Sequence, residues 1–147
     1  MEKTVVISFV LMANLFVIVQ QNKHNLTINV NALKNSKGTV LIALYNQEGS
    51  IPDENFEAYY KKKIASISNN KARVTFAGLP EGQYAATILH DENNNEKIDK
   101  KFMLPLPSEG VGFSNYDDFG LNNRPNFKKA SFNIVKDTSI TIKAIYK

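Results

Sequence analysis

Short apolar runs, separated at regular intervals by turn-forming residues, constrain the fold of this chain more than any other feature. In residues 26–31, the apolar Leu26, Ile28 and Val30 alternate with polar side chains. Alternation with a period of two is typical of a strand with one buried face. Residues 39–45 are apolar at almost every position, which indicates a strand in the interior of a sheet.

The remaining runs complete an all-β pattern. They lie at residues 64–68, 71–77, 84–89, 130–134 and 140–146. Asn69 and Asn70 predict a hairpin turn between the first two of these runs, because asparagine tolerates the positive φ that such a turn needs. Residues 53–60 are the exception, since they predict one or two helical turns with Asp53 as the N-cap. About seven short strands without a βαβ rhythm favour one antiparallel β-sandwich, immunoglobulin-like or transthyretin-like, with a long functional loop over residues 90–127.

The first residues do not have the pattern of the β-sandwich and are interpreted separately. Lys3 precedes an apolar run, residues 5–19, that only two polar residues interrupt. The run is short for a membrane span and is typical of a secretory signal peptide. We therefore expect a signal peptide over residues 1–21 and a mature domain over residues 22–147 that has no membrane span and is secreted, periplasmic or at the cell surface. An uncleaved anchor is the alternative interpretation.

Composition excludes several kinds of site. The chain has no cysteine, so it has no disulfide, no zinc–thiolate site, no nucleophilic thiol and no lipid-modified cysteine. Its net charge of +4 comes from scattered lysines. No nucleic-acid motif accompanies these lysines, so we interpret them as solvated strand edges and loops and expect no nucleic-acid partner.

The loop that follows the strand at residues 84–89 is crowded with side-chain oxygens. Positions one, three, five and nine of a calcium-loop pattern are Asp91, Asn93, Asn95 and Asp99, and Lys97 stands where such a loop uses a backbone carbonyl. A hard cation such as Ca²⁺ prefers several oxygen ligands of this kind. The spacing therefore predicts a calcium site.

The pattern departs from an EF-hand at two positions. Position six is Glu96 rather than the usual glycine, and position twelve is Phe102 rather than glutamate. We expect Glu109 to supply the missing carboxylate, with Asp117 or Asp118 as alternatives. The other interpretation needs no metal, because Asn and Asp side chains also satisfy the backbone of their own loop as Asx turns.

Motifs in and around this loop resemble a known family. In chain order they are Leu79-Pro80-x-Gly82-x-Tyr84, then His90-Asp91-x-Asn93-x-Asn95 with Asp99, then Pro107-x-Glu109-Gly110-x-Gly112-Phe113-Ser114-Asn115. Together they resemble domain-of-unknown-function family 2141, a bacterial family of uncharacterised secreted proteins, over residues 25–145. The resemblance implies an exported β-sandwich without an established activity. Residues 101–107 depart from the family pattern, which has a glycine-containing run there. The first motif also resembles transthyretin-like and carboxypeptidase-regulatory-like domains, which mostly bind or support rather than catalyse.

The same region holds candidates for a ligand-facing surface. They are His90, Phe113, Ser114, Asn115 and Tyr116. Aromatic rings beside amides stack on sugars or anchor protein interfaces. The alternative is that these rings pack the loop onto the sandwich and that the histidine is only a strand-end residue. The serine has no GxSxG context and no evident base, so the sequence does not predict a hydrolase.

These observations lead to one functional hypothesis and two alternatives. We expect an exported, non-catalytic binding or accessory module for a glycan, peptide or protein, with its loop ordered by Ca²⁺. One alternative is a purely structural cell-envelope component without a metal. The weakest alternative is a carbohydrate-active enzyme that uses two of the loop carboxylates, although no spacing selects a pair.

Overall fold

A computed structural model describes residues 21–101 and 104–147. Nearly all of the predicted signal peptide, residues 1–20, therefore lies outside the described residues. Within the described ranges, no helix is long and apolar enough to cross a membrane.

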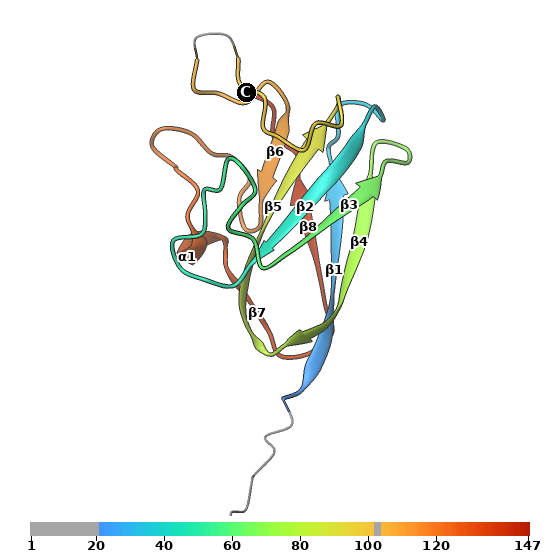
Figure 1. Ribbon diagram of the computed structural model, residues 1–147, viewed down its shortest axis with the longest axis vertical. Coiled ribbons are helices and arrows are strands. Elements are labelled where there is room, and N and C mark those ends of the chain that lie inside the picture. The colour runs from blue at the N-terminus through green and yellow to red at the C-terminus, as the bar shows by residue number, and fades with distance from the viewer. Residues whose placement is uncertain (1–20, 102–103) are drawn as a thin grey trace, which may run out of the picture.

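The described chain forms eight strands and one short helix (Figure 1). In order they are β1 (Lys23–Asn31), β2 (Thr39–Tyr45), β3 (Lys61–Ser66), β4 (Ala72–Pro80), β5 (Gly82–Asp91), β6 (Gly110–Phe113), α1 (Phe127–Ala130), β7 (Phe132–Ile134) and β8 (Thr138–Lys143). The prediction of an all-β chain is confirmed. The four-residue strand β6 was not predicted, because its two glycines hide the apolar pattern.

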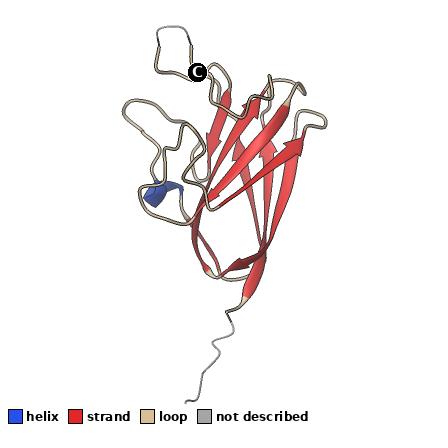
Figure 2. Cartoon of the chain, viewed as in Figure 1, coloured by secondary structure: helices blue, strands red, loops and turns tan. Residues whose placement is uncertain are grey.

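The strands form two facing sheets (Figure 2). One sheet has the order β4-β1-β8, and the other has the order β3-β2-β5-β6, with β7 pairing to the start of β5. All these pairs are antiparallel except β1 and β8, which run parallel. The prediction of an antiparallel β-sandwich is confirmed, with this one parallel pair as a departure from it. The cause is topological, because the turn after β7 carries the chain to the second sheet at the end where β1 also begins.

Gly112 allows β6 to lie close to the segment that follows β8 in the other sheet. Val111 of β6 exchanges two backbone hydrogen bonds with Ile145, which follows the last strand of the other sheet. Beside it, a Cβ atom on Gly112 would lie 2.3 Å from the carbonyl oxygen of Lys143. Only glycine permits this approach of two backbones.

The two central strands, β2 and β5, are buried on both faces, which confirms the prediction of an interior strand at residues 39–45. Their first face packs between the sheets in what we call the sandwich core, which includes Leu26, Ile28, Val40, Ile42, Leu44, Phe76, Ile88 and Ile142. Their second face packs beneath loops in what we call the loop-covered core, which comprises Leu41, Ala43, Tyr45, Ile51, Phe56, Ala85, Leu89, Val111, Phe113, Tyr116, Phe127 and Ala130. The loops that cover the second core lie to the left of the sheets in Figure 1.

Two local predictions have opposite outcomes. The hairpin turn is confirmed, with positive φ at Asn69 (50°) and Asn70 (56°). The helical turns at residues 53–60 are wrong, since this segment has no helix. The Asp53 side chain accepts a hydrogen bond from the backbone N–H of Glu57, four residues on rather than the two or three of an N-cap. A positive φ of 52° at Phe56 turns the chain out of a helical path.

Candidate functional site

The acidic loop, residues 91–99, is organised by its first residue. Asp91 ends β5 and is almost fully buried, and its carboxylate accepts hydrogen bonds from the backbone N–H groups of Asn95 (3.1 Å) and Glu96 (2.8 Å). Asn94 and Glu96 both have positive φ, 61° and 58°. Glu96 thus adopts the backbone conformation for which calcium loops use glycine, so the loop curls despite that substitution.

Two of the three asparagine amides in the loop contact the carboxylate of Asp99. The Asn93 Nδ2 donates to it at 2.7 Å, and the Asn95 Nδ2 donates to both its oxygens at 3.1 and 3.2 Å. The Oδ1 atoms of the same amides accept from the backbone of Asn95 and Lys97. Each amide is therefore satisfied on both sides, as the Asx-turn interpretation requires.

Glu109 joins the two ends of the acidic loop. Its side chain is only 6% exposed, and its two oxygens accept from the backbone N–H groups of Glu92 (3.0 Å) and Asp99 (3.4 Å). Burial raises the pKa of Glu109, the two backbone donors oppose that shift, and the carboxylates of Asp99 and Asp91 add to it. The carboxylates of Asp91 and Asp99 therefore lie close enough to Glu109 to disfavour its charge.

Asp118, one of the two alternative carboxylates, has a different partner. Asp118 instead forms an ion pair with Lys147, which lowers the pKa of Asp118. Across the described ranges, no three His, Asp or Glu side chains are arranged as ready-made metal ligands. The structure thus brings Asp91, Asp99 and Glu109 to one loop, but with their oxygens turned toward the loop's own N–H groups.

His90 is not available to a ligand, and its place in the predicted ligand surface is wrong. It is fully buried on the sandwich side of β5, where Nε2 donates to the carbonyl of Lys37 at 2.9 Å. A carbonyl only accepts, so in the neutral ring Nδ1 accepts from the hydroxyl of Tyr146 at 2.6 Å. That hydroxyl in turn accepts from the backbone of Lys34. The ring closes one end of the sandwich core.

The rest of the predicted ligand surface fastens the covering loop instead. Phe113, Ser114 and Tyr116 are buried, so they do not form the exposed ligand surface that the sequence predicted. The Ser114 hydroxyl accepts from the backbone of Ala86 and donates to the carbonyl of Ala130 at 2.6 Å.

Tyr116 and Asn115 complete this fastening. The Tyr116 hydroxyl accepts from the backbone N–H of Asn126 at 3.2 Å and donates to the carbonyl of Arg124 at 3.2 Å. Asn115 is exposed but has a positive φ of 61°, and its amide donates to the carbonyl of Ser131. The packing interpretation of this set is therefore the correct one.

A match to a protein-family model shows which family the chain belongs to. The model described as "Uncharacterized protein conserved in bacteria (DUF2141)" matches residues 28–143, which span both sheets and the acidic loop. The chain belongs to the DUF2141 family. The resemblance inferred from the sequence motifs is thereby confirmed.

Other comparisons add little to this membership. No curated protein matches the chain. Two solved structures of the pilus-presented adhesin Spy0125 (Cpa), one of a cysteine-to-alanine mutant, are similar to it at 18% and 17% identity, each with a TM-score of 0.28. Each match covers 85% of this chain but only 28% and 27% of the adhesin, so the chain spans less than a third of that protein. A likeness this low says nothing of what a DUF2141 chain binds.

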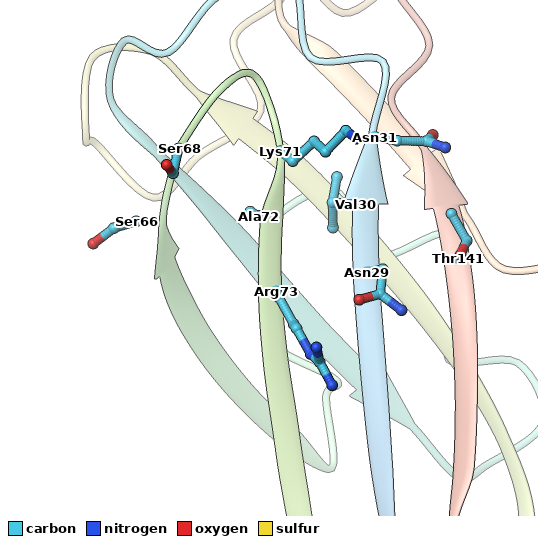
Figure 3. A pocket seen from close by; sticks show the side chains of 9 residues that line it. All are labelled: Asn29, Val30, Asn31, Ser66, Ser68, Lys71, Ala72, Arg73 and Thr141. Atoms are coloured by element: carbon cyan, nitrogen blue, oxygen red, sulfur yellow. The ribbon is translucent and has the colours of Figure 1, made fainter.

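A hollow of about 630 Å³ lies on the three-stranded sheet (Figure 3). Its polar side chains include Asn29 of β1, Arg73 of β4 and Thr141 of β8. Figure 3 shows them spread over three neighbouring strands rather than converging on one point. The arrangement is that of a solvated sheet surface.

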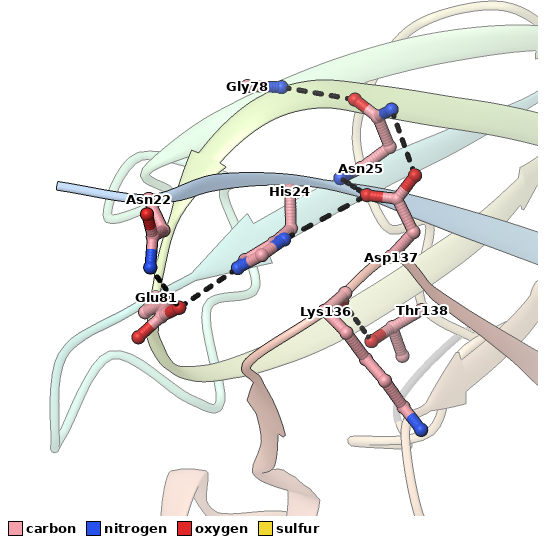
Figure 4. Close-up of polar contacts among 8 residues, drawn as sticks. All are labelled: Asn22, His24, Asn25, Gly78, Glu81, Lys136, Asp137 and Thr138. Atoms are coloured by element: carbon pink, nitrogen blue, oxygen red, sulfur yellow. Dashed lines mark hydrogen bonds and ion pairs between the residues drawn. The ribbon is translucent and has the colours of Figure 1, made fainter.

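The end of the sandwich where β1 begins is tied by surface polar contacts (Figure 4). His24 lies between Glu81, at 3.0 Å, and Asp137, at 4.0 Å. The Asp137 carboxylate also accepts from the backbone of Asn25 at 2.8 Å. These contacts join β1 to the turns before β5 and β8, and they account for this cluster without a ligand.

Proposed function

We propose that the protein is an exported, non-catalytic binding or accessory module whose acidic loop binds Ca²⁺. The observation that supports the calcium site is the grouping of Asp91, Asp99 and the buried Glu109 at one loop. A divalent cation there would relieve the repulsion among these carboxylates, and hard oxygen ligands suit Ca²⁺ better than Mg²⁺, which keeps more of its water.

Binding would require a defined rearrangement of the loop. The amides of Asn93 and Asn95 now present nitrogen to Asp99. A cation needs oxygen there, so both amides would rotate and release the Asp99 carboxylate toward the ion. The hydrogen bonds that the loop makes with itself set the free-energy cost of that change, and the affinity for Ca²⁺ is reduced accordingly.

Thermal unfolding of the 147-residue chain in EDTA, in calcium and in magnesium tests the site. A ligand at about one hundred times its Kd stabilises the native state by about 2.7 kcal/mol, which raises the midpoint by several degrees. We expect this rise in calcium and not in magnesium. Asp99→Asn should abolish the rise, while Asp137→Asn, which removes a carboxylate at the opposite end, should leave it intact.

The purely structural alternative also has an observation in its favour. The amides of Asn93 and Asn95 and the carboxylates of Asp91 and Asp99 already have hydrogen-bond partners within the loop. An equal unfolding midpoint in EDTA and in millimolar calcium would favour that alternative and would contradict the calcium proposal.

A further inference from the structure

A cavity of about 540 Å³ lies between the loop-covered face of the larger sheet and the loops above it. Its walls are mainly apolar and include Ile98, Leu106, Val111, Phe113 and Phe119. Small-molecule sites commonly have volumes of about 300–1,000 Å³, apolar walls and a few placed polar groups. None of the motifs in the sequence points to this cavity, because its walls come from segments far apart in the chain.

One polar group at the base of the cavity lacks a partner. Thr87 of β5 lines the cavity and is 2% exposed, yet its Oγ1 has no hydrogen-bond partner among the described residues. A buried unsatisfied hydroxyl is costly and uncommon. The Oγ1 atom itself is covered, so a rotation of the Thr87 side chain about χ1 would bring the hydroxyl to a group that enters the cavity.

The Tyr45 hydroxyl lies near Thr87 but has another partner. The Tyr45 hydroxyl donates to the carboxylate of Asp53 at 3.1 Å. Burial and then Asp53 raise the pKa of Tyr45, and nearby Thr87 lowers it by a smaller amount, although the two hydroxyls do not meet in hydrogen-bond geometry. The Asp53 carboxylate also accepts from two backbone N–H groups, so its capacity is largely taken.

The mouth of the cavity has exposed apolar side chains and one cation available to a ligand. Leu104 is 53% exposed and Leu121 is 78% exposed, and both line the cavity. Lys100 is held by Glu54 at 2.5 Å. Arg124 is exposed and also lines the cavity, and no carboxylate in the described ranges pairs with its guanidinium. The mouth thus favours an anionic group beside an apolar body.

We infer that this cavity binds a small amphipathic acid, with an apolar body inside, a hydroxyl at the inner end against Thr87, and a carboxylate at the mouth against Arg124. The inference rests on the proposal that the protein is a binding module, since it names the ligand class of such a module. It does not depend on the calcium site.

Calorimetric titration of the full chain with three matched probes tests this inference. The probes are 12-hydroxydodecanoate, which has both polar ends, dodecanoate, which lacks the inner hydroxyl, and 1,12-dodecanediol, which lacks the carboxylate. We expect one molecule of 12-hydroxydodecanoate to bind, and each of the other probes to bind roughly three- to tenfold more weakly.

Substitutions of Thr87 and Arg124 test which residue contacts the hydroxyl of the probe and which contacts its carboxylate. Thr87→Val keeps the shape of the side chain and should remove the preference for 12-hydroxydodecanoate over dodecanoate. Arg124→Gln should weaken both acids and leave the diol unchanged. Arg73→Gln, on the other sheet, is the matched control and should change nothing. Methyl NMR signals of Ile98 and Val111 should shift on binding, and those of Val30 in the sandwich core should not.

The outcomes separate the inference from the proposed function. If no probe binds, or if the shifts fall outside the cavity, the inference is overturned, while a calcium-dependent rise in the unfolding midpoint would still support the proposed module. If all three probes bind equally, and if neither Thr87→Val nor Arg124→Gln changes their affinities, the cavity binds apolar chains without recognising their polar ends. The stated ligand class is then wrong.

Discussion

The two faces of β5 are both buried but have different surroundings. Ile88 faces the sandwich core and Leu89 faces the loop-covered core, and each is 0% exposed. The first face meets strands of the opposite sheet, whereas the second meets loops. The cavity and the unpaired Thr87 hydroxyl both occur on the second face. Regular strands fill space evenly, and loops leave the gaps in which ligands bind.

The same contrast appears where β5 ends. His90, on the sandwich side, forms a closed set of hydrogen bonds with Tyr146 and the Lys37 carbonyl. Asp91, on the loop side, organises the acidic loop, where it and Asp99 lie close enough to Glu109 to disfavour its charge. One face therefore ends in a fully satisfied polar pair, and the other ends in a site with an electrostatic reason to accept a cation.

Alanine substitutions at the two adjacent core residues should reveal this difference. Ile88→Ala should lower the free energy of unfolding by roughly 3–5 kcal/mol, because strands on both sides hold the resulting cavity open. Leu89→Ala should cost less, roughly 2–3 kcal/mol, because the covering loops can relax into the space. Urea unfolding monitored by far-UV circular dichroism measures both values. A larger loss for Leu89→Ala would show that the loops are as rigid as the strands.

Tyr146→Phe should destabilise the protein by about 1–3 kcal/mol, because it leaves the Nδ1 of the buried His90 without its hydroxyl partner. The backbone N–H of Lys34 also loses its acceptor, but it is exposed and water can replace that bond. The same unfolding assay applies. Tyr59→Phe is the control, because Tyr59 is exposed and its hydroxyl makes no hydrogen bond among the described groups. Equal stabilities of Tyr146→Phe and the wild type would mean that the hydrogen bond between His90 and Tyr146 adds nothing to the free energy of unfolding.

Sequence reasoning could predict the sandwich core but only part of the loop-covered core. Alternation at Leu26, Ile28 and Val30 reports a buried face directly, since the period of a strand equals two. It cannot report that residues 84–91 are buried on both sides, because the second cover comes from loops without a period. The aromatic Phe113 and Tyr116 were thus interpreted as an exposed ligand surface, although both are buried in the loop-covered core.

The candidate sites follow the same rule. The acidic loop is contiguous in sequence, so its residues could be named from their spacing. Glu109, one of three carboxylates that the sequence offered as a further ligand, does contact the loop backbone. The cavity joins Thr87, Ile98 and Arg124, which come together only through the fold. The parallel pairing of β1 with β8 was missed for a related reason, since strand order depends on where turns cross between sheets.

Glu109 should give the acidic loop a distinctive pH dependence. Burial, with Asp99 and Asp91 nearby, raises the pKa of Glu109 above its ordinary value of 4.5. Its contribution to stability is therefore fully present below about pH 4.5 and is lost as the pH rises through the raised pKa. The difference in unfolding free energy between the wild type and Glu109→Gln, measured by urea titration at each pH, should fall as the pH rises.

Glu92→Gln is the control with the opposite sign. The amide of Asn35, followed by the charge of Lys34, lowers the pKa of Glu92. The wild type should therefore gain stability over Glu92→Gln as the pH rises, until Glu92 is ionised in the unfolded state as well. Saturating calcium should flatten the Glu109 slope if the ion compensates the carboxylate charge. The same slope with and without calcium would argue against an ion at this loop.

The smallest stability change is expected at Thr87, and it sharpens the contrast between the two kinds of buried hydroxyl. Thr87→Val should leave the free energy of unfolding within about 0.5 kcal/mol of the wild type or raise it, because the change removes a buried hydroxyl that has no partner. Ser114→Ala should instead cost about 1–3 kcal/mol, since the Ser114 hydroxyl joins the backbone of Ala86 to the Ala130 carbonyl. Both variants are compared by urea unfolding without ligand. A loss at Thr87→Val as large as that at Ser114→Ala would mean that the fold already uses the Thr87 hydroxyl, and a group that is already paired cannot be held open for a ligand.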